Sequence, residues 1–309
     1  MEVILVGFES LGVRSQATFI QARNMTIFID PSAALAPRRY GLPPHVLEVK
    51  WLLKIFSKIE DLVRDSEYII ITHYHYDHHD PGRFVDPSVF KGKKFLIKDF
   101  NSYINFSQKM RAHRYLNTIK KFAESIIIAD GKSLKVGSTM ILLSLPLPHG
   151  RDSRLGYVIS ICVEDDTSLL FTSDIEGGSS EEHMRLNNFC KPEIAIIDGP
   201  PTYLLGYSFY EEDLKHSIKF LNAFIDRNET HLKVMILDHH IFRDLNYINF
   251  IKEIKLTQNV YIKTAAEFMG VEPRPLEAFR KALYKAEDES GLDMLKNVLR
   301  HSDEGELVD

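Results

Sequence analysis

Cysteine is scarce in this sequence, and its scarcity limits how the chain can be cross-linked. Only Cys162 and Cys190 occur among 309 residues, which excludes a framework of several disulfides. Each cysteine lies in or beside an apolar stretch. We therefore predict two buried free thiols and no disulfide, a pattern typical of a reducing compartment.

Long apolar runs and strong net charge are also missing. No run approaches the roughly 20 apolar residues that a membrane-spanning helix needs. No N-terminal segment has the charged, apolar and small-residue order of a signal peptide. The formal net charge of −5 gives no strong overall attraction to nucleic acid. We expect a cytoplasmic protein without a membrane partner, and the sequence leaves its oligomeric state open.

The composition that is present suits a layered α/β protein. Hydrophobic residues make up 44% of the chain and charged residues 26%, both ordinary for a globular protein. A chain of this length can bury a sizeable core within one domain. Pro273 and Pro275 mark a boundary, so we predict one domain over residues 1–270 and a helical appendage over residues 271–309, packed on that domain.

Runs of β-branched and aromatic residues predict strands, and apolar residues at three- and four-residue steps predict helices. We expect strands at residues 2–8, 17–22, 25–30, 68–71, 94–98, 126–129, 134–136, 139–145, 157–163, 168–171, 194–197, 234–237 and 260–263. We expect helices at residues 46–64, 100–122, 209–227 and 276–299.

Polar chemistry is concentrated directly after the predicted buried strand at residues 68–71. His73, His75, His78 and His79 fall within seven residues, with Asp77 among them. Along an extended chain His73, His75 and Asp77 would point one way, and His78 the other way as the chain turns. Imidazoles and carboxylates packed this closely are unfavourable without a cation to organise them. The stretch therefore predicts a metal site, with exposed surface histidines as the alternative.

The segment from His73 to His78 resembles the HxHxDH signature of the metallo-β-lactamase superfamily, and the resemblance covers roughly residues 1–270. Single polar residues after three later apolar stretches match that family's remaining motifs in order. They are His149, Asp174 and His239. The resemblance implies an α/β fold of the four-layer αββα sandwich type. It is greatest to the branch of predicted hydrolases without an assigned substrate.

The resemblance also implies a ligand set for two divalent metal ions. His73, His75 and His149 would hold one ion, and Asp77, His78 and His239 the other, with Asp174 bridging. Zinc is the default for such ligands, and iron or manganese also fits. A hydroxide shared by the two ions would be the nucleophile. Of the adjacent pair His239 and His240, only one is expected to face the site, and we favour His239.

Further residues are candidates for supporting or catalytic roles. The resemblance implies that Asp30 orients a ligand histidine, although an Asp-Pro turn explains it equally well. Asp77 could also orient the nucleophile or protonate the leaving atom. His79 is a second catalytic candidate and would act as a proton donor. The alternatives are that it supports a ligand from behind or is simply exposed. Arg151 and Arg154 lie close to His149 in the sequence and either orient a substrate or form a charged turn.

A basic stretch spans residues 91–121, with nine Lys and Arg side chains against one aspartate and aromatic residues between them. It predicts either a patch for phosphate-rich substrates or, as we slightly favour, a solvated helical face above an aromatic core stripe. The nine charged side chains are spread over the whole segment, and this spacing does not guarantee that they share one face of the protein.

The sequence therefore predicts a binuclear metal-dependent hydrolase that acts on a phosphodiester or on an ester or lactone. We expect a small-molecule or phosphorylated substrate as its partner, and the basic stretch tilts the expectation slightly towards the phosphorylated one. Tyr76 stands where the superfamily's tRNA-processing nucleases usually carry glycine, which argues against that role. The alternatives are a nucleic-acid binder or RNA-processing nuclease that uses residues 91–121, and a non-hydrolytic di-iron protein. A di-iron protein of this kind would normally need a flavin-binding domain. The chain has neither the room for such a domain nor the Gly-rich loop that would bind the flavin.

Overall fold

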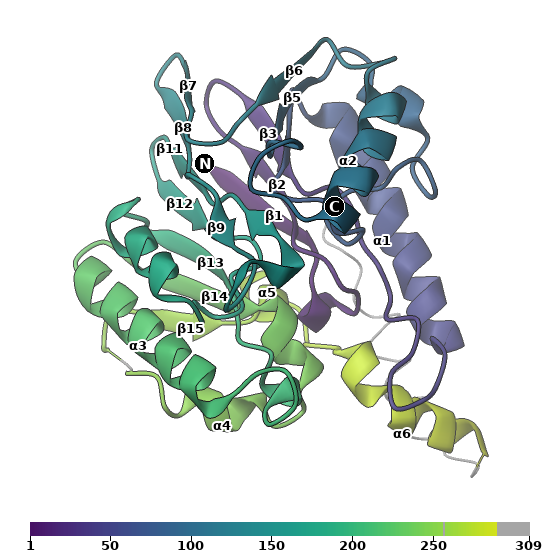
Figure 1. Ribbon diagram of the computed structural model, residues 1–309, viewed down its shortest axis with the longest axis vertical. Helices are drawn as coiled ribbons and strands as arrows, with labels where there is room; N and C mark the ends of the chain where they lie inside the picture. The colour runs from purple at the N-terminus through teal and green to yellow at the C-terminus, as the bar shows by residue number, and fades with distance from the viewer. Residues whose placement is uncertain (256, 289–309) are drawn as a thin grey trace.

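Two mixed β-sheets stacked face to face form the centre of the protein (Figure 1). We describe a computed structural model that covers residues 1–255 and 257–288. The first sheet has the order β1-β2-β3-β4-β5-β6. Its strands are β1 (Glu2–Gly7), β2 (Ala17–Gln21), β3 (Thr26–Ile29), β4 (Tyr68–Ile71), β5 (Lys94–Ile97) and β6 (Ser125–Ile128).

The second sheet has the order β15-β14-β13-β12-β11-β8-β7. Its strands are β7 (Ser133–Val136), β8 (Thr139–Leu143), β11 (Ile161–Glu164), β12 (Ser168–Phe171), β13 (Ile194–Asp198), β14 (Val234–Asp238) and β15 (Tyr261–Lys263). A separate two-residue pair is made by β9 (Leu147–Pro148) and β10 (Tyr157–Val158). Buried aliphatic side chains from both sheets meet in the middle of the sandwich, among them Ile27, Ile70, Ile141 and Ile236.

Helices cover the outer faces of the two sheets. α1 (Val46–Asp65) and α2 (Phe106–Ile119) cover the first sheet, and α3 (Glu211–Asn228) and α4 (Tyr247–Ile251) cover the second (Figure 1). Shorter helices lie between these elements: η1 (Glu9–Leu11), η2 (Pro87–Phe90), η3 (Ser153–Leu155), η4 (Glu181–Asn188), η5 (Thr202–Leu204), η6 (His239–Arg243) and α5 (Ala265–Phe268). This arrangement confirms the predicted four-layer αββα sandwich.

Parallel strands bring polar residues to a common edge. Strands β3 to β6 are parallel to one another, and so are β12 to β15. The carboxyl ends of parallel strands lie at the same sheet edge, where ligands are generally bound. The two sheets are joined at this edge by a bond of 2.7 Å between the hydroxyls of Thr72 and Ser173. Residues that follow β3, β4, β12 and β14 therefore lie close together.

The predicted elements are confirmed in kind, with several different boundaries. The strand expected at residues 157–163 is broken into β10 and β11. The helix expected from residue 100 begins only at Phe106, because the Asn105 side chain accepts a hydrogen bond from Gln108 N and caps it. Only part of the helix expected at residues 276–299 can be compared, as α6 (Leu276–Asp288); residues 289–309 lie outside the described chain.

The prediction of two free thiols is wrong. Cys162, in β11, and Cys190, after η4, form a disulfide with a Cα–Cα distance of 6.0 Å. Both side chains are buried beneath α3 in the outer core of the second sheet. The two residues are 28 positions apart, and only the return of the chain through η4 places Cys190 opposite Cys162. Two cysteines in separate apolar stretches carry no signal of that return.

The described part of the C-terminal segment packs against α1 and the N-terminal region. The fully buried guanidinium of Arg280 bonds both carboxylate oxygens of Glu48 at 2.7 Å, and Glu277 pairs with Arg14. The division into a domain and an appendage stays a prediction. Among the described residues, no helix combines the length and the apolar character that crossing a membrane requires.

Candidate metal centre

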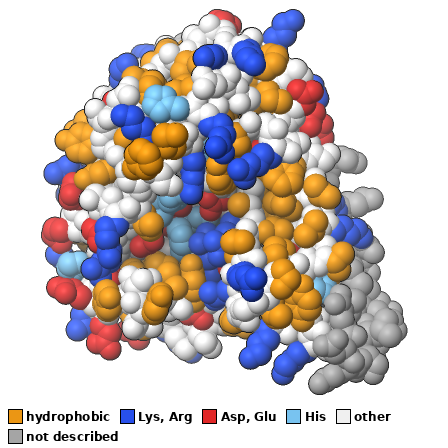
Figure 2. Space-filling model, turned by 45° about the vertical axis from the view of Figure 1, so that its right-hand side comes forward, with side chains coloured by type: hydrophobic (Ala, Val, Ile, Leu, Met, Phe, Trp, Pro, Cys, Tyr) orange, Lys and Arg blue, Asp and Glu red, His pale blue; other side chains and the backbone are white. Residues whose placement is uncertain are grey.

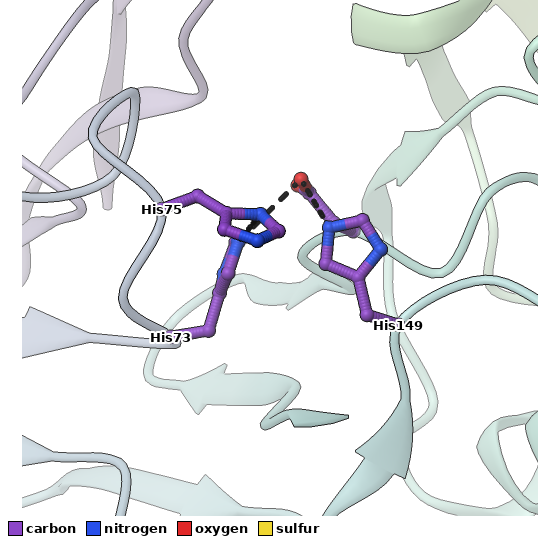
Figure 3. A group of neighbouring side chains, drawn as sticks. His73, His75 and His149 are labelled. Carbon is purple, nitrogen blue, oxygen red and sulfur yellow. Dashed lines mark hydrogen bonds and ion pairs between the residues drawn. The ribbon is translucent and has the colours of Figure 1, made fainter. Parts of the chain in front are cut away.

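Three segments far apart in the sequence meet at the shared sheet edge. His73 and His75 follow β4, His149 follows β9, and Asp174 follows β12. One ligand atom from each of these residues lies within 4.8 Å of the others. His73 Nε2 lies 3.6 Å and His149 Nε2 3.2 Å from Asp174 Oδ2. Figure 3 shows the three imidazole rings converging on one point.

A second group of ligand atoms adjoins the first. Asp77, His78 and His239, which opens η6, also place ligand atoms within 4.8 Å of one another. Asp174, which contacts His73 and His149 of the first group, also contacts the second. Its Oδ1 lies 3.2 Å from His78 Nε2 and its Oδ2 lies 3.4 Å from His239 Nε2. The carboxylate thus stands between two clusters of imidazoles.

The expectation that His78 points away from His73 is wrong. The backbone N–H groups of His78 and His79 both donate to His75 O, so the chain curls into a turn after His75 and is not extended. The turn brings the His78 ring to 4.0 Å from the His73 ring. Alternation of side chains applies only while a strand continues, and β4 ends at Ile71.

The donor atoms of this centre suit metal ions. His78 Nε2, both ring nitrogens of His149 and Asp174 Oδ2 are buried and make no hydrogen bond. Such groups are costly to bury without a partner. They belong to imidazoles and a carboxylate, the ligands that zinc and similar divalent ions take. The residues present therefore fit a pair of divalent cations.

Buried carboxylates hold three of the imidazoles from behind. Asp30 Oδ2 lies 2.8 Å from His78 Nδ1, Glu9 Oε2 lies 2.7 Å from His239 Nδ1, and Asp198 Oδ1 lies 2.9 Å from His240 Nδ1. A carboxylate on Nδ1 fixes the tautomer and leaves the Nε2 lone pair facing the metal side. Asp30 thus contacts His78, and its predicted role in orienting a ligand stays a prediction. It also accepts two hydrogen bonds from Thr72.

Glu9 and Asp198 were not among the site residues predicted from the sequence. Asp198 is a polar residue at the end of a buried strand, the same signal that singled out Asp174. Glu9 follows β1 in an otherwise apolar segment. A single buried acid at a strand end was the available signal in both cases.

Backbone strain is concentrated in the same loops. Asp30, Ser173, Glu176 and His239 have φ values of 50°, 58°, 48° and 62°, in the left-handed region that non-glycine residues rarely adopt. Such residues cluster at functional sites, where the surrounding structure holds them. The positive φ of His239 turns the chain sharply between β14 and η6 and directs its ring towards Asp174.

Burial and neighbouring charges lower the pKa of some histidines of the centre and raise the pKa of others. Burial, followed by the positive potential of His149, lowers the pKa of His75 to about 3. Burial opposes protonation of His239, but the Glu9 and Asp174 carboxylates outweigh it and raise its pKa to about 10. His78 has a raised pKa for the same reason, since Asp174 and Asp30 outweigh its burial. Without metal, the second group therefore carries protons and His75 does not.

Comparison with known proteins places the chain in a family. No family model matches it. It is 46% identical over 293 residues to a UPF0282 protein of Sulfurisphaera tokodaii, covering 93% of this chain and 94% of that one. It is 44% identical over 313 residues to a UPF0282 protein of Metallosphaera sedula, covering 99% and 100%. The chain belongs to the UPF0282 family.

The fold of this UPF0282 chain is shared with a solved structure. Tm1679, a metal-dependent hydrolase of the β-lactamase superfamily, aligns with a TM-score of 0.50 over 85% of this chain and 96% of its own, at 14% identity. That likeness shows the fold alone. The UPF0282 chain therefore has the metallo-β-lactamase fold together with His and Asp clusters that could bind metal.

His79 is not placed as a catalytic residue in the UPF0282 chain. Its ring is fully buried, about 5 Å from the Tyr115 ring, and its Nδ1 donates to the carbonyl of His75 at 2.9 Å. None of the candidate metal groups among the described residues includes it. Its position does not fit proton donation to a substrate. The turn that presents His75 and His78 points His79 into the core.

Both adjacent histidines after β14 face the centre, so the expectation that only one would do so is wrong. His240, Asp174 and His239 place ligand atoms within 4.8 Å of one another. The η6 helix begins at His239, whose φ is 62°, and this tight turn lets both rings face the same side. In an extended strand, consecutive side chains would point to opposite sides.

Arg151 and Arg154 lie at the edge of a pocket next to the metal centre. The pocket holds about 260 Å³. Its lining combines the two guanidinium groups and two acids with mainly apolar residues: His149, Arg151, Asp152, Arg154, Leu155, Glu176, Pro201, Leu204, Ser208 and Phe209. Asp152 pairs with both arginines, and Asp213 pairs with Arg151. Their substrate-orienting role stays a prediction.

The basic stretch at residues 91–121 does not form one face. Lys98 is buried and pairs with Asp130 at 2.8 Å, and Lys94 pairs with Glu67. Arg111 stacks on the Tyr76 ring, beside the metal motif. Figure 2 shows a hollow in the surface of the molecule, with histidine side chains inside it and Lys and Arg side chains beside it.

Proposed function

We propose that this chain is a binuclear metal-dependent hydrolase. The first cation would be held by His73, His75 and His149, the second by Asp77, His78 and His239, and Asp174 would bridge them. The observation that carries the proposal is the convergence of buried ligand atoms without hydrogen-bond partners, on His78, His149 and Asp174. A structural polar network would satisfy those atoms with protein groups.

When bound, divalent cations, zinc in the first instance, polarise the scissile bond and lower the pKa of water towards neutrality. The chain's own groups prepare that chemistry. Asp30 and Glu9 hold the rings of His78 and His239 in one tautomer. Asp77 has a side chain 16% exposed, whereas that of Asp174 is 1% exposed. This greater exposure supports Asp77 as the carboxylate that accepts a proton from water or returns it to a leaving group.

The pocket beside His149 supports a substrate with two parts. Leu155, Pro201, Leu204 and Phe209 offer an apolar surface, and Arg151 and Arg154 offer guanidinium donors at its edge. Guanidinium groups match phosphate and carboxylate oxygens. We favour a small organic phosphodiester over an uncharged ester or lactone for this reason.

Metal analysis combined with a substrate screen tests the proposal. We expect two zinc, iron or manganese ions per chain in native protein, and turnover of bis-p-nitrophenyl phosphate in preference to a panel of lactones. Asp174→Asn should lose metal and turnover together. His113→Gln, which changes an exposed histidine outside the centre, is the matched control and should lose neither. A native protein without metal, or full turnover by the Asp174 variant, would overturn the proposal.

A further inference from the structure

A guanidinium group lies inside the second ligand group. Arg243, the last residue of η6, is only 4% exposed. Its Nη2 lies 3.2 Å from His239 Nε2 and 3.9 Å from Asp77 Oδ2. Both of those atoms belong to proposed ligands of the second cation. A permanent positive charge therefore stands beside the place where that cation would bind.

Arg243 and a metal ion need the same atom of His239. Glu9 Oε2 engages His239 Nδ1 at 2.7 Å, so Nε2 is the nitrogen that gives up its proton and coordinates when a cation binds. The lone pair that Nε2 then exposes faces the guanidinium N–H of Arg243. One lone pair cannot accept a hydrogen bond from Arg243 and coordinate a cation at full strength at the same time. Binding of the second cation must therefore weaken or displace this contact.

The guanidinium is held firmly in place. Arg243 Nε donates to Glu9 Oε1 at 2.6 Å, while the other oxygen of the same carboxylate holds His239. Arg39 Nη2 donates to the carbonyl of Arg243 at 2.8 Å, which fixes its backbone. An arginine stays charged at every physiological pH. The positive charge is thus a constant feature of the second position.

The first position has no such neighbour among the described residues. The polar side chains next to its imidazoles carry no positive charge: Thr72 and Ser173 lie at His73 Nδ1, Gln108 Nε2 lies 3.5 Å from His75 Nε2, and Glu176 lies 3.9 Å from His149 Nδ1. Arg151 lies in the adjoining pocket and is paired with Asp152 and Asp213. The two positions therefore differ in charge although their ligand atoms are alike.

We propose that the two cation positions are unequal, because Arg243 competes for His239 and repels the second cation. One ion is retained tightly by His73, His75, His149 and Asp174, and the second position fills only at higher metal concentration. The activity of the centre then depends on metal supply in the range where the second position loads. This inference rests on the proposed metal-dependent function and adds the order in which the centre fills.

Zinc titration of metal-stripped protein tests the inequality directly. Calorimetry with a competing chelator, followed by metal analysis after dialysis, gives the two dissociation constants. In the wild type we expect two separated values and one ion kept after dialysis. Arg243→Met should lower the second dissociation constant at least about tenfold, the scale on which groups adjoining the ligands alter metal affinity. The first constant should change much less.

Two further variants separate charge from structure. Arg243→Lys keeps the positive charge, so its second position should stay weak. Arg38→Met removes an exposed guanidinium away from the proposed ligands, and its two constants should match the wild type. If Arg243→Met does not fold, as judged by circular dichroism, Arg243→Gln provides the same loss of charge with a donor retained.

The outcomes distinguish this inference from the proposed function. Two equal, tight sites in an active wild type would overturn the inequality and leave the hydrolase intact. An unchanged ratio of constants in both neutral variants would also overturn it. Wild-type protein that binds no zinc at any concentration would overturn both proposals.

Discussion

Glu9 and His239 are 230 residues apart in the chain, yet their side chains share a hydrogen bond of 2.7 Å in the candidate metal centre. The same carboxylate also bonds Arg243. One acid from the N-terminal η1 helix thus positions both a proposed metal ligand and the cation beside it. It makes the first and last thirds of the chain depend on each other for one site.

Glu9→Gln should weaken metal binding without removing a ligand. The amide keeps the shape of the side chain but loses the charge that holds the Nδ1 proton of His239. We expect metal affinity to fall about 10- to 100-fold, as for other groups that orient ligand histidines. Zinc titration measures it. Glu2→Gln, at an exposed position of β1, is the control; equal affinities for the two variants would contradict the expected role.

His240→Gln should affect turnover more than metal content. Its ring faces Asp174 and His239, but the proposed ligands for both cations are already provided by other residues. Loss of one hydrogen bond to substrate would lower kcat/KM about tenfold, equal to about 1.4 kcal/mol. Metal analysis should still find two ions per chain under saturating zinc. Loss of one ion from this variant would instead identify His240 as a ligand.

Metal binding should release protons and strengthen as the pH rises. The raised pKa values of His78 and of His239, the latter about 10, keep both rings protonated at neutral pH in metal-free protein. A coordinated imidazole must be deprotonated, so the metal displaces those protons. Calorimetric zinc titrations in buffers of different ionisation enthalpy count them. Heats that do not depend on the buffer would show that the rings are neutral beforehand.

Reduction of the Cys162–Cys190 disulfide should destabilise the fold. The bond closes a loop of 28 residues, and cross-links of this size contribute about 3.5 kcal/mol to the free energy of unfolding. Urea unfolding with and without a reductant measures the difference. A double variant, Cys162→Ala with Cys190→Ala, should show no response to the reductant. Free thiols found by labelling of unreduced, denatured wild type would rule the bond out.

Arg280→Met should destabilise the protein strongly, although α6 is peripheral. Arg280 and Glu48 are both fully buried, so the change leaves a carboxylate of α1 without its partner. Breaking such a buried pair costs about 3–5 kcal/mol. The double variant Arg280→Met with Glu48→Gln should recover part of that loss, because it also removes the unpaired charge. Urea unfolding compares them, and a single variant as stable as the wild type would show that α6 does not dock there.

Local sequence patterns were sufficient for most of the fold. The strand Tyr68–Ile71 was predicted with its observed limits, because four consecutive apolar residues fit a strand buried on both faces. The helix at residues 46–64 differs from α1 by one residue, since its apolar positions recur at helical spacing. The strand predicted at residues 157–163 failed because pairing with β9 and with β8 draws its two halves into different sheets.

The sequence by itself determined that His73, His75, Asp77 and His78 lie together, because they are neighbours at the end of one strand. It also marked His149, Asp174 and His239 as polar residues at strand ends. Asp174 and His239 follow parallel strands of one sheet, which end at a common edge. Only the tertiary structure decided which distant groups stand behind them: Glu9 on His239, Asp198 on His240, Arg243 beside the second position, and Cys190 on Cys162. Those pairings depend on how the two sheets stack and how the loops return, and spacing along the chain carries no record of either.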